Sequence, residues 1–213
     1  MRNYAIIGAS GLIGGCLINE IIQHTNDRIT LITRRPLKLS NSRITEIIVD
    51  FSNQSALNDA LKGIDAVFIA IGTTQKKMKG DLVAYGKIDY DIPVAVAQAC
   101  LVNQIPKLLL VSSVGANSSS KNFYLRLKGE VEQALENLPI QYIGIFQPSL
   151  LLGNRNEFRL GEKISQLIMP IFSFMLPSKY KPVAAKSIAK AMIREAIQDH
   201  KGVKRYTYTD IIH

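Results

Sequence analysis

The residues with the clearest chemical potential are a serine pair and a tyrosine–lysine pair near the middle of the chain. Tyr124 and Lys128 are four residues apart in a stretch, residues 119–137, that is predicted to be a helix, so both side chains project from one face. An ammonium close to a phenol stabilises the phenolate, and a serine at the end of the preceding strand can hydrogen-bond a carbonyl or hydroxyl oxygen. We therefore predict that Tyr124 donates or accepts a proton, that Lys128 supports it, and that Ser113 orients the reacting oxygen. Ser112 takes the place of Ser113 if the strand register slips by one residue, and a tyrosine–lysine pair at this spacing also occurs in ordinary helices.

A glycine-rich turn near the N-terminus predicts a cofactor for these residues. Gly8, Gly11 and Gly14 follow the apolar residues 4–7 and open into a helical pattern over residues 12–24. The order of strand, tight glycine turn and helix is the context of a dinucleotide-binding fingerprint, in which a pyrophosphate lies against the helix N-terminus. The spacing here is G-x-x-G-x-x-G, and the alternative is a purely structural turn. Beside a bound nicotinamide, the serine, tyrosine and lysine would couple proton transfer to hydride transfer.

The end of the second expected strand predicts which dinucleotide binds. Residues 28–33 form this strand, and Arg34, Arg35 and Pro36 follow it. An NAD site usually has a carboxylate about 20 residues beyond the glycines, whereas a 2′-phosphate is bound by guanidinium groups. The position holds Thr33 and two arginines, so we expect NADP(H) to be preferred over NAD(H). A solvated basic turn is the alternative.

The alternation of apolar strands and helical patterns predicts the architecture. We expect an α/β protein with a single doubly wound Rossmann fold, a mainly parallel sheet and a small C-terminal helical region on the substrate side. Strands are expected at residues 4–7, 28–33, 44–50, 65–71, 107–113, 140–146 and 203–209, and helices at residues 12–24, from Ser52 or Asn53 to Lys62, and at residues 81–103, 119–137 and 184–198. Residues 1–213 are expected to form one domain, in which residues from about 148 to 213 cover the substrate side. Residues 164–176 form either a helix packed on the core or an apolar wall of the substrate site.

Ligands of such a fold bind beyond the carboxyl ends of the strands. The residues expected to contact the dinucleotide are therefore those of the glycine turn and of the strand ends, together with the catalytic lysine: Gly8, Ser10, Gly11, Leu12, Ile13, Gly14, Arg34, Arg35, Asp50, Phe51, Ala70, Ile71, Gly72, Thr73, Ser112, Lys128 and Pro148.

Composition narrows the classes of partner. The net charge of +9 is spread along the chain without an aromatic-interleaved basic stripe, so we expect no nucleic-acid binding. The first strand begins at once, and no apolar run reaches the length of a membrane span, so neither a secretory signal nor a transmembrane segment is expected. Cys16 and Cys100 lack metal-ligand spacing, which predicts no metal site and reduced thiols in a cytoplasmic protein. The expected partner is a small-molecule substrate, either apolar or acidic and met by Lys76, Lys77 and Lys79, and the chain is expected to be a monomer or a homodimer.

Taken together, these motifs resemble the short-chain dehydrogenase/reductase superfamily, of the atypical kind. The likeness covers essentially the whole chain and is greatest to the oxidoreductases related to Tat-interactive protein. It recurs in Ile71-Gly72-Thr73-Thr74, in Ser112-Ser113-Val114-Gly115-Ala116, and in residues 124–132, 148–155 and 159–162. The resemblance implies an NADP-binding Rossmann protein with a serine, tyrosine and lysine active site, and it carries little information on the substrate.

Two departures from the superfamily pattern leave a second hypothesis open. Ile71-Gly72-Thr73 replaces the Asn-Ala-Gly element after the fourth strand, and Gln147-Pro148 replaces an Arg-Pro pair after the sixth. The first hypothesis is an NADP-dependent oxidoreductase that acts on a small carbonyl or alcohol. The second is a catalytically weak NADP(H)-binding sensor that regulates a partner. Sugar-nucleotide epimerases share the triad, but they carry a larger substrate lobe than the residues after Pro148 would supply.

Overall fold

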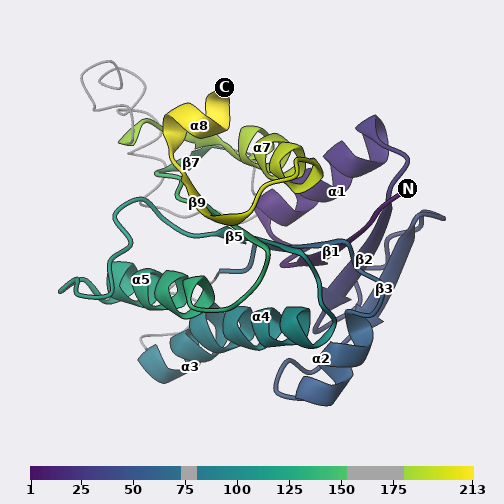
Figure 1. Ribbon diagram of the computed structural model, residues 1–213, viewed down its shortest axis with the longest axis horizontal. Helices are drawn as coiled ribbons and strands as arrows, with labels where there is room; N and C mark the ends of the chain where they lie inside the picture. The colour runs from purple at the N-terminus through teal and green to yellow at the C-terminus, as the bar shows by residue number, and fades with distance from the viewer. Residues whose placement is uncertain (73–80, 153–179) are drawn as a thin grey trace.

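The computed structural model describes residues 1–72, 81–152 and 180–213 of the chain (Figure 1). These residues form a seven-stranded sheet in the order β3-β2-β1-β4-β5-β6-β9, and every strand pair in it is parallel. The strand order reverses direction between β1 and β4, as in a doubly wound Rossmann fold. The predicted fold class is therefore confirmed.

The elements follow one another as alternating strands and helices. The strands of the central sheet are β1 (Asn3–Ile7), β2 (Arg28–Thr33), β3 (Ile44–Ile48), β4 (Ala66–Ile69), β5 (Lys107–Val111), β6 (Tyr142–Phe146) and β9 (Gly202–Tyr206). The helices are α1 (Leu12–His24), α2 (Gln54–Ala60), α3 (Leu82–Gly86), the π-helical turn η1 (Lys87–Asp91), α4 (Ile92–Val102), α5 (Phe123–Glu136), α7 (Ala185–Ile197) and α8 (Tyr208–Ile212).

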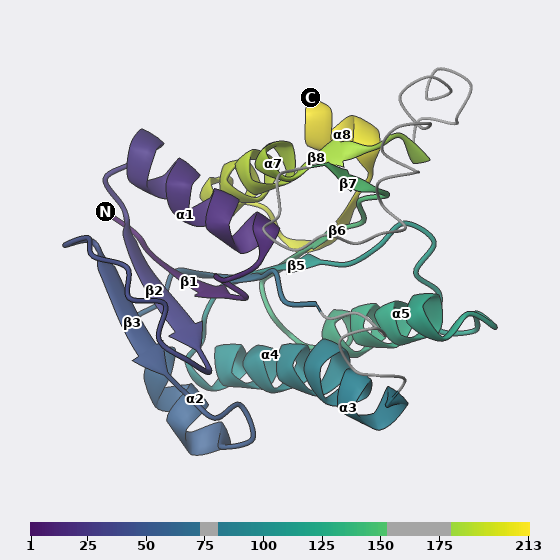
Figure 2. The ribbon, with the colours of Figure 1, turned by 180° about the vertical axis from the view of Figure 1, so that it is seen from behind.

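Helices cover both faces of the sheet, which explains the continuous apolar strands in the sequence. Helices α1, α7 and α8 lie on one face, and α2, α3, α4 and α5 lie on the other (Figures 1 and 2). All residues of β4 and β6 are buried, whereas the edge strand β9 is exposed along most of its length. The carboxyl ends of the central strands therefore meet at one edge of a sheet that helices cover on both faces.

The helix expected over residues 81–103 is interrupted in the structure. It divides into α3, η1 and α4, and Pro93 stands at the start of α4. Proline has no N–H group, so it cannot donate the α-helical hydrogen bond to the carbonyl of the residue four positions earlier, Asp89. The wider π-turn accommodates this loss and brings the Asp89 side chain into a fully buried position.

Other element boundaries also differ from the predicted ones. Helix α5 begins at Phe123 rather than near Ser119, because the Asn122 side chain accepts a hydrogen bond from the Leu125 N–H (3.2 Å) and caps the helix. The last strand ends at Tyr206, and the capping box of Thr207 and Asp210 starts α8, which the sequence analysis missed. The short parallel pair of β7 (Leu151–Leu152) and β8 (Val183–Ala184) was not predicted either.

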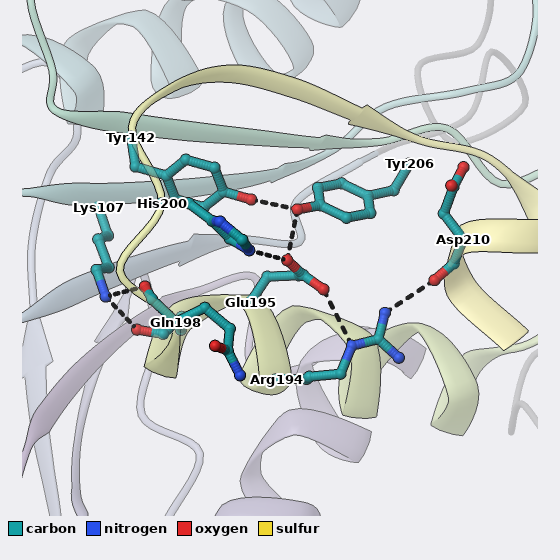
Figure 3. A network of polar contacts seen from close by, with 9 residues as sticks. Lys107, Tyr142, Arg194, Glu195, Gln198, His200, Tyr206 and Asp210 are labelled. Carbon is teal, nitrogen blue, oxygen red and sulfur yellow. Dashed lines mark hydrogen bonds and ion pairs between the residues drawn. The ribbon is translucent and has the colours of Figure 1, made fainter. Parts of the chain in front are cut away.

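A polar network fastens the C-terminal elements to the sheet (Figure 3). Glu195 of α7 accepts a hydrogen bond from the Tyr206 hydroxyl (2.6 Å), forms an ion pair with Arg194 (3.0 Å) and lies 2.9 Å from His200 Nε2. Tyr206 in turn contacts the Tyr142 hydroxyl at 2.5 Å. Of the stretch from 148 to 213 that was expected to cover the substrate side, β9 thus completes the central sheet and α7 packs on α1. The predicted helix over residues 164–176 lies outside the described residues.

Candidate active site

The glycine turn joins β1 to α1 at the carboxyl edge of the sheet. Gly8 has φ +93°, and a Cβ there would lie 2.6 Å from the Ala70 carbonyl carbon and oxygen, at the end of β4. A Cβ on Gly14 would lie 2.2 Å from the Gly8 oxygen. The turn is thus packed backbone to backbone, and side chains are excluded from it by contact as well as by backbone conformation.

The same turn fits a bound pyrophosphate. Gly11 is the N-cap of α1, and it has no side chain that could accept from the N–H groups of the first helical turn. Those groups and the positive end of the helix dipole are therefore left for an anionic ligand. The cradle that Cβ atoms would fill and the uncapped helix N-terminus are what a dinucleotide requires at this position.

A cavity of about 710 Å³ lies over the turn, within the usual range for small-molecule and cofactor sites. It is lined by residues at or after the ends of β1, β2, β3 and β4 and by one residue of η1, namely Gly8, Ala9, Ser10, Gly11, Ile32, Thr33, Arg34, Arg35, Leu37, Phe51, Ala70, Ile71, Gly72 and Ile88. The fold thus brings together the glycine turn, the arginine pair and the end of β4, as the sequence analysis expects of a cofactor cleft. Sequence reasoning missed the apolar side chains of Ile32, Leu37 and Ile88, whose only signal is their place next to strand ends or in an interrupted helix.

A carboxylate that the sequence analysis did not consider supports the arginine turn. Glu46 of β3 accepts hydrogen bonds from the Leu37 N–H (2.6 Å) and the Thr33 hydroxyl (3.3 Å) through the same oxygen. Arg34 and Arg35 lie between these two donors and are exposed. The sequence has no carboxylate directly after β2, but the neighbouring strand brings one to this turn.

The tyrosine–lysine pair lies on α5, as predicted, but with an additional partner. The Lys128 ammonium lies 5.9 Å from the centre of the Tyr124 ring and 2.9 Å from Asp89 Oδ1. Lys128 and Asp89 are both buried, whereas Tyr124 is 36% exposed. The tyrosine can therefore meet a substrate, while the lysine is held from behind by a buried carboxylate.

Asp89 also links this pair to the cavity. A Cβ on Gly72, which lines the cavity, would lie 3.7 Å from Asp89 Oδ1. Ile88, the neighbour of Asp89 in η1, lines the same cavity. Asp89 was not predicted as a site residue, because its inward position depends on the π-turn, for which Pro93 is the only signal in the sequence.

The loop after β5 is fixed against α5. A Cβ on Gly129 would lie 2.2 Å from the Ser118 nitrogen, so only glycine lets this loop lie on the helix beside Lys128. The Asn117 N–H donates to the Leu125 carbonyl (3.0 Å), which ties the loop to the first turns of α5. Ser113 stands at the start of this loop, and its hydroxyl donates a long bond of 3.4 Å to the Val114 carbonyl. A bond of this length is weak, so the Ser113 hydroxyl can turn toward a ligand.

Ser112 is committed to a different group of side chains. Its buried hydroxyl donates to the carboxylate of Glu132 on α5. Gln147 Nε2 donates to both oxygens of the same carboxylate at 2.9 Å, and Arg205 Nε lies 3.5 Å from it. The glutamine of the unusual Gln147-Pro148 pair thus helps to hold the ends of β5 and β6 on α5.

The remaining predicted residues take several positions. Asp50 is exposed just after β3, and the Ser52 N–H, which donates to its carboxylate (3.0 Å), holds the pKa of this group below its usual value. Leu12, Ile13 and Gly14 form the first turn of α1 and do not line the cavity. The Pro148 carbonyl accepts the Val114 N–H at 2.9 Å. Thr73, Lys76, Lys77 and Lys79 lie outside the described residues.

Within residues 1–72, 81–152 and 180–213, no cluster of three metal-ligating side chains was found. In the same ranges, no helix combines the length and the apolar character that a membrane crossing requires.

Comparisons with known proteins agree with this geometry. Residues 8–199 match the model of a family described as NAD(P)H-binding. Protein HTATIP2 of Rattus norvegicus is 31% identical over 205 residues, which cover 94% of this chain and 84% of that protein. Among solved structures, the Bordetella bronchiseptica enzyme WbmH in complex with NAD+ has the same fold, with a TM-score of 0.73 and 18% identity over 97% of this chain and 75% of that chain.

One comparison corrects a prediction. The Candida albicans protein FMP52, named mitochondrial, is 33% identical over 88% of this chain and 85% of its own length, and several other fungal relatives carry the same name. These mitochondrial relatives contradict the expectation of a cytoplasmic location. The expectation rested on unpaired cysteines and on the lack of a long apolar run, and neither feature distinguishes the two compartments.

Proposed function

Because this chain belongs to the NAD(P)H-binding family of Rossmann proteins, within the atypical short-chain dehydrogenase/reductase superfamily, we propose that it is an NADP(H)-preferring oxidoreductase acting on a small carbonyl or alcohol. One observation carries the proposal. Gly72 lines the cavity over the glycine turn, and a Cβ on it would lie 3.7 Å from Asp89, which forms a buried ion pair with Lys128 beside the exposed Tyr124. A cofactor cleft and a proton-transfer group therefore lie next to each other.

The preference for NADP(H) is supported by the arginine pair in the cavity. Arg34 and Arg35 are charged, exposed and adjacent, and guanidinium groups bind phosphate oxygens through paired hydrogen bonds. The glycine turn and the first turn of α1 would hold the pyrophosphate. The bound cofactor would supply or accept the hydride, which is chemistry that no side chain of this chain can perform.

The residues of the chain would handle the proton and the substrate oxygen. Tyr124 would donate a proton to a carbonyl oxygen in the reductive direction and accept one in the oxidative direction. Ser113 would orient that oxygen through its hydroxyl, while the Lys128 ammonium would stabilise the phenolate and bind the ribose next to the nicotinamide.

A substrate screen with one paired variant tests this function. The parent chain should oxidise NADPH with some member of a panel of small aldehydes and ketones. Tyr124→Phe removes only a hydroxyl, so NADPH affinity and stability should persist while turnover falls about 10²- to 10⁴-fold. Tyr208→Phe on α8 is the matched control and should turn over at the parent rate. Equal turnover of Tyr124→Phe and the parent would show that Tyr124 is not the proton donor.

A second function is favoured by one specific observation. Lys128 is already paired with Asp89, and Gln147 is bound to Glu132, so groups near the cleft are held by the protein itself. A catalytically weak NADP(H)-binding sensor that controls a partner would not need Lys128 and Gln147 to be available for catalysis. NADPH binding in calorimetry without turnover on any compound of the panel would support the sensor.

A further inference from the structure

We propose that Glu46 sets the cofactor preference of the cleft by clasping the turn that carries Arg34 and Arg35. This proposal rests on the NADP(H) preference proposed above and names the residue that produces it. Glu46 does not line the cavity, and it is a positioning residue that acts through the arginines.

The clasp closes the turn at both ends. One carboxylate oxygen of Glu46 accepts the Thr33 hydroxyl at 3.3 Å and the Leu37 N–H at 2.6 Å, so residues 34–36 bulge between two groups bound to the same atom. The Thr33 carbonyl is held separately by the Val49 N–H (2.8 Å), which continues the pairing of β2 with β3. Pro36 further restricts the backbone of the turn. The Cα positions of the two arginines are thereby fixed relative to the cavity.

A fixed backbone matters because the two guanidinium groups repel each other and have long side chains. Without a constraint, binding of a 2′-phosphate would have to pay the entropy of ordering the whole turn as well as both side chains. The Glu46 oxygen that accepts the Leu37 N–H at 2.6 Å supplies that constraint before the ligand arrives.

The same contacts keep the carboxylate from serving NAD(H). An acidic side chain at this end of a Rossmann cleft selects NAD(H) when it accepts the free ribose hydroxyls. In this chain Glu46 is engaged by two donors of the protein and lies outside the cavity lining. The acidic residue Glu46 is present, but it holds the turn that carries Arg34 and Arg35 instead of binding the ribose.

Three substitutions of Glu46 separate the effect of its side-chain length from the effect of its charge. Glu46→Ala removes the acceptor, Glu46→Asp keeps the charge but shortens the side chain, and Glu46→Gln keeps both the length and an acceptor oxygen without the charge. Thr45→Ala, on the exposed neighbouring position of β3, is the matched control. For each variant, calorimetric titration gives the ratio of the NADPH and NADH affinities. The same titration with adenosine 2′,5′-bisphosphate and with 5′-AMP measures the contribution of the 2′-phosphate alone.

We expect the NADPH-to-NADH affinity ratio to fall about tenfold in Glu46→Ala and clearly in Glu46→Asp, mainly through weaker NADPH binding. Glu46→Gln and Thr45→Ala should keep the parent ratio within about threefold. Urea unfolding reports the stability separately, and a purely structural role of Glu46 would lower stability without changing the ratio.

The outcomes distinguish this proposal from the proposed function. If the parent prefers NADPH and Glu46→Ala or Glu46→Asp retains the full ratio, the clasp is refuted and the proposed function stands. If Glu46→Gln loses the ratio as completely as Glu46→Ala, charge rather than the clasp sets the preference. Equal affinity of the parent for NADPH and NADH refutes the preference itself.

Discussion

Two regions of this molecule are built around a buried carboxylate that faces a cation, and they differ in their surroundings. Glu195 lies under the C-terminal elements, where Tyr206, Arg194 and His200 surround it (Figure 3). Asp89 lies in the π-turn η1, where it meets Lys128 on one side and the cavity residue Gly72 on the other. Both side chains are about equally buried, at 5% and 1% exposure, so burial and ion pairing by themselves do not mark a functional site. The distinction lies in the neighbouring space, because Asp89 adjoins Gly72 of the cavity over the glycine turn, whereas Glu195 is not among the residues that line this cavity.

The two regions should therefore respond differently to substitution. Damage to the network of Glu195 should cost stability alone, whereas damage to the pair of Asp89 and Lys128 should cost both stability and cofactor affinity. Three experiments test this contrast.

The largest effect is expected for Lys128→Met, which leaves the Asp89 carboxylate buried without its ammonium. Breaking one side of a buried ion pair typically costs about 3–5 kcal/mol, and the loss of the lysine should also weaken NADPH binding. Combining Lys128→Met with Asp89→Leu should restore at least half of the lost stability but none of the NADPH affinity. Urea unfolding and calorimetric titration measure the two quantities. A double variant that binds NADPH like the parent would show that the pair of Asp89 and Lys128 does not contribute to cofactor binding.

A smaller effect is expected for Tyr206→Phe in the C-terminal network. The substitution removes a hydroxyl donor to Glu195 and a partner of the Tyr142 hydroxyl, so the free energy of unfolding should fall by about 1.5–3 kcal/mol. NADPH affinity should remain at the parent value, because no residue of the network lines the cavity. A drop in NADPH affinity in this variant, measured by the same titration, would mean that the two regions are coupled.

The smallest effect concerns the pH dependence of stability. Burial raises the pKa of Glu195, but the hydrogen bonds from Tyr206 and Arg194 outweigh it, so the net pKa lies below its ordinary value. A lowered folded-state pKa stabilises the protein above the unfolded-state value, and that stability is lost as the pH falls through the folded-state value. Glu195→Gln should therefore show a flatter loss of stability in the acid range than the parent, by about 1 kcal/mol or less. Identical acid unfolding curves would assign the acid sensitivity to other carboxylates.

Much of the fold follows from local patterns in the sequence. Continuous apolar stretches such as residues 107–111 and 142–146 are typical of strands whose side chains are buried on both faces of a sheet, and the structure has β5 and β6 at these residues. The turn from Gly8 to Gly14 needs glycines because backbone meets backbone there, so its sequence already carries its geometry. Boundaries were less predictable where a single cap decides them, as Asn122 does for α5 and Thr207 for α8.

The sequence by itself determined the Rossmann class, the glycine turn, the arginine pair and the helical spacing of Tyr124 and Lys128, because each depends on residues close together along the chain. Only the tertiary structure decided the partners of these groups. Glu46 reaches the arginine turn from the next strand, Asp89 reaches Lys128 from another helix, and Glu132 engages Ser112 across the layers of the fold. A polar side chain acquires its partner from sheet register and helix packing, and these are set by the burial of the whole core rather than by neighbouring residues.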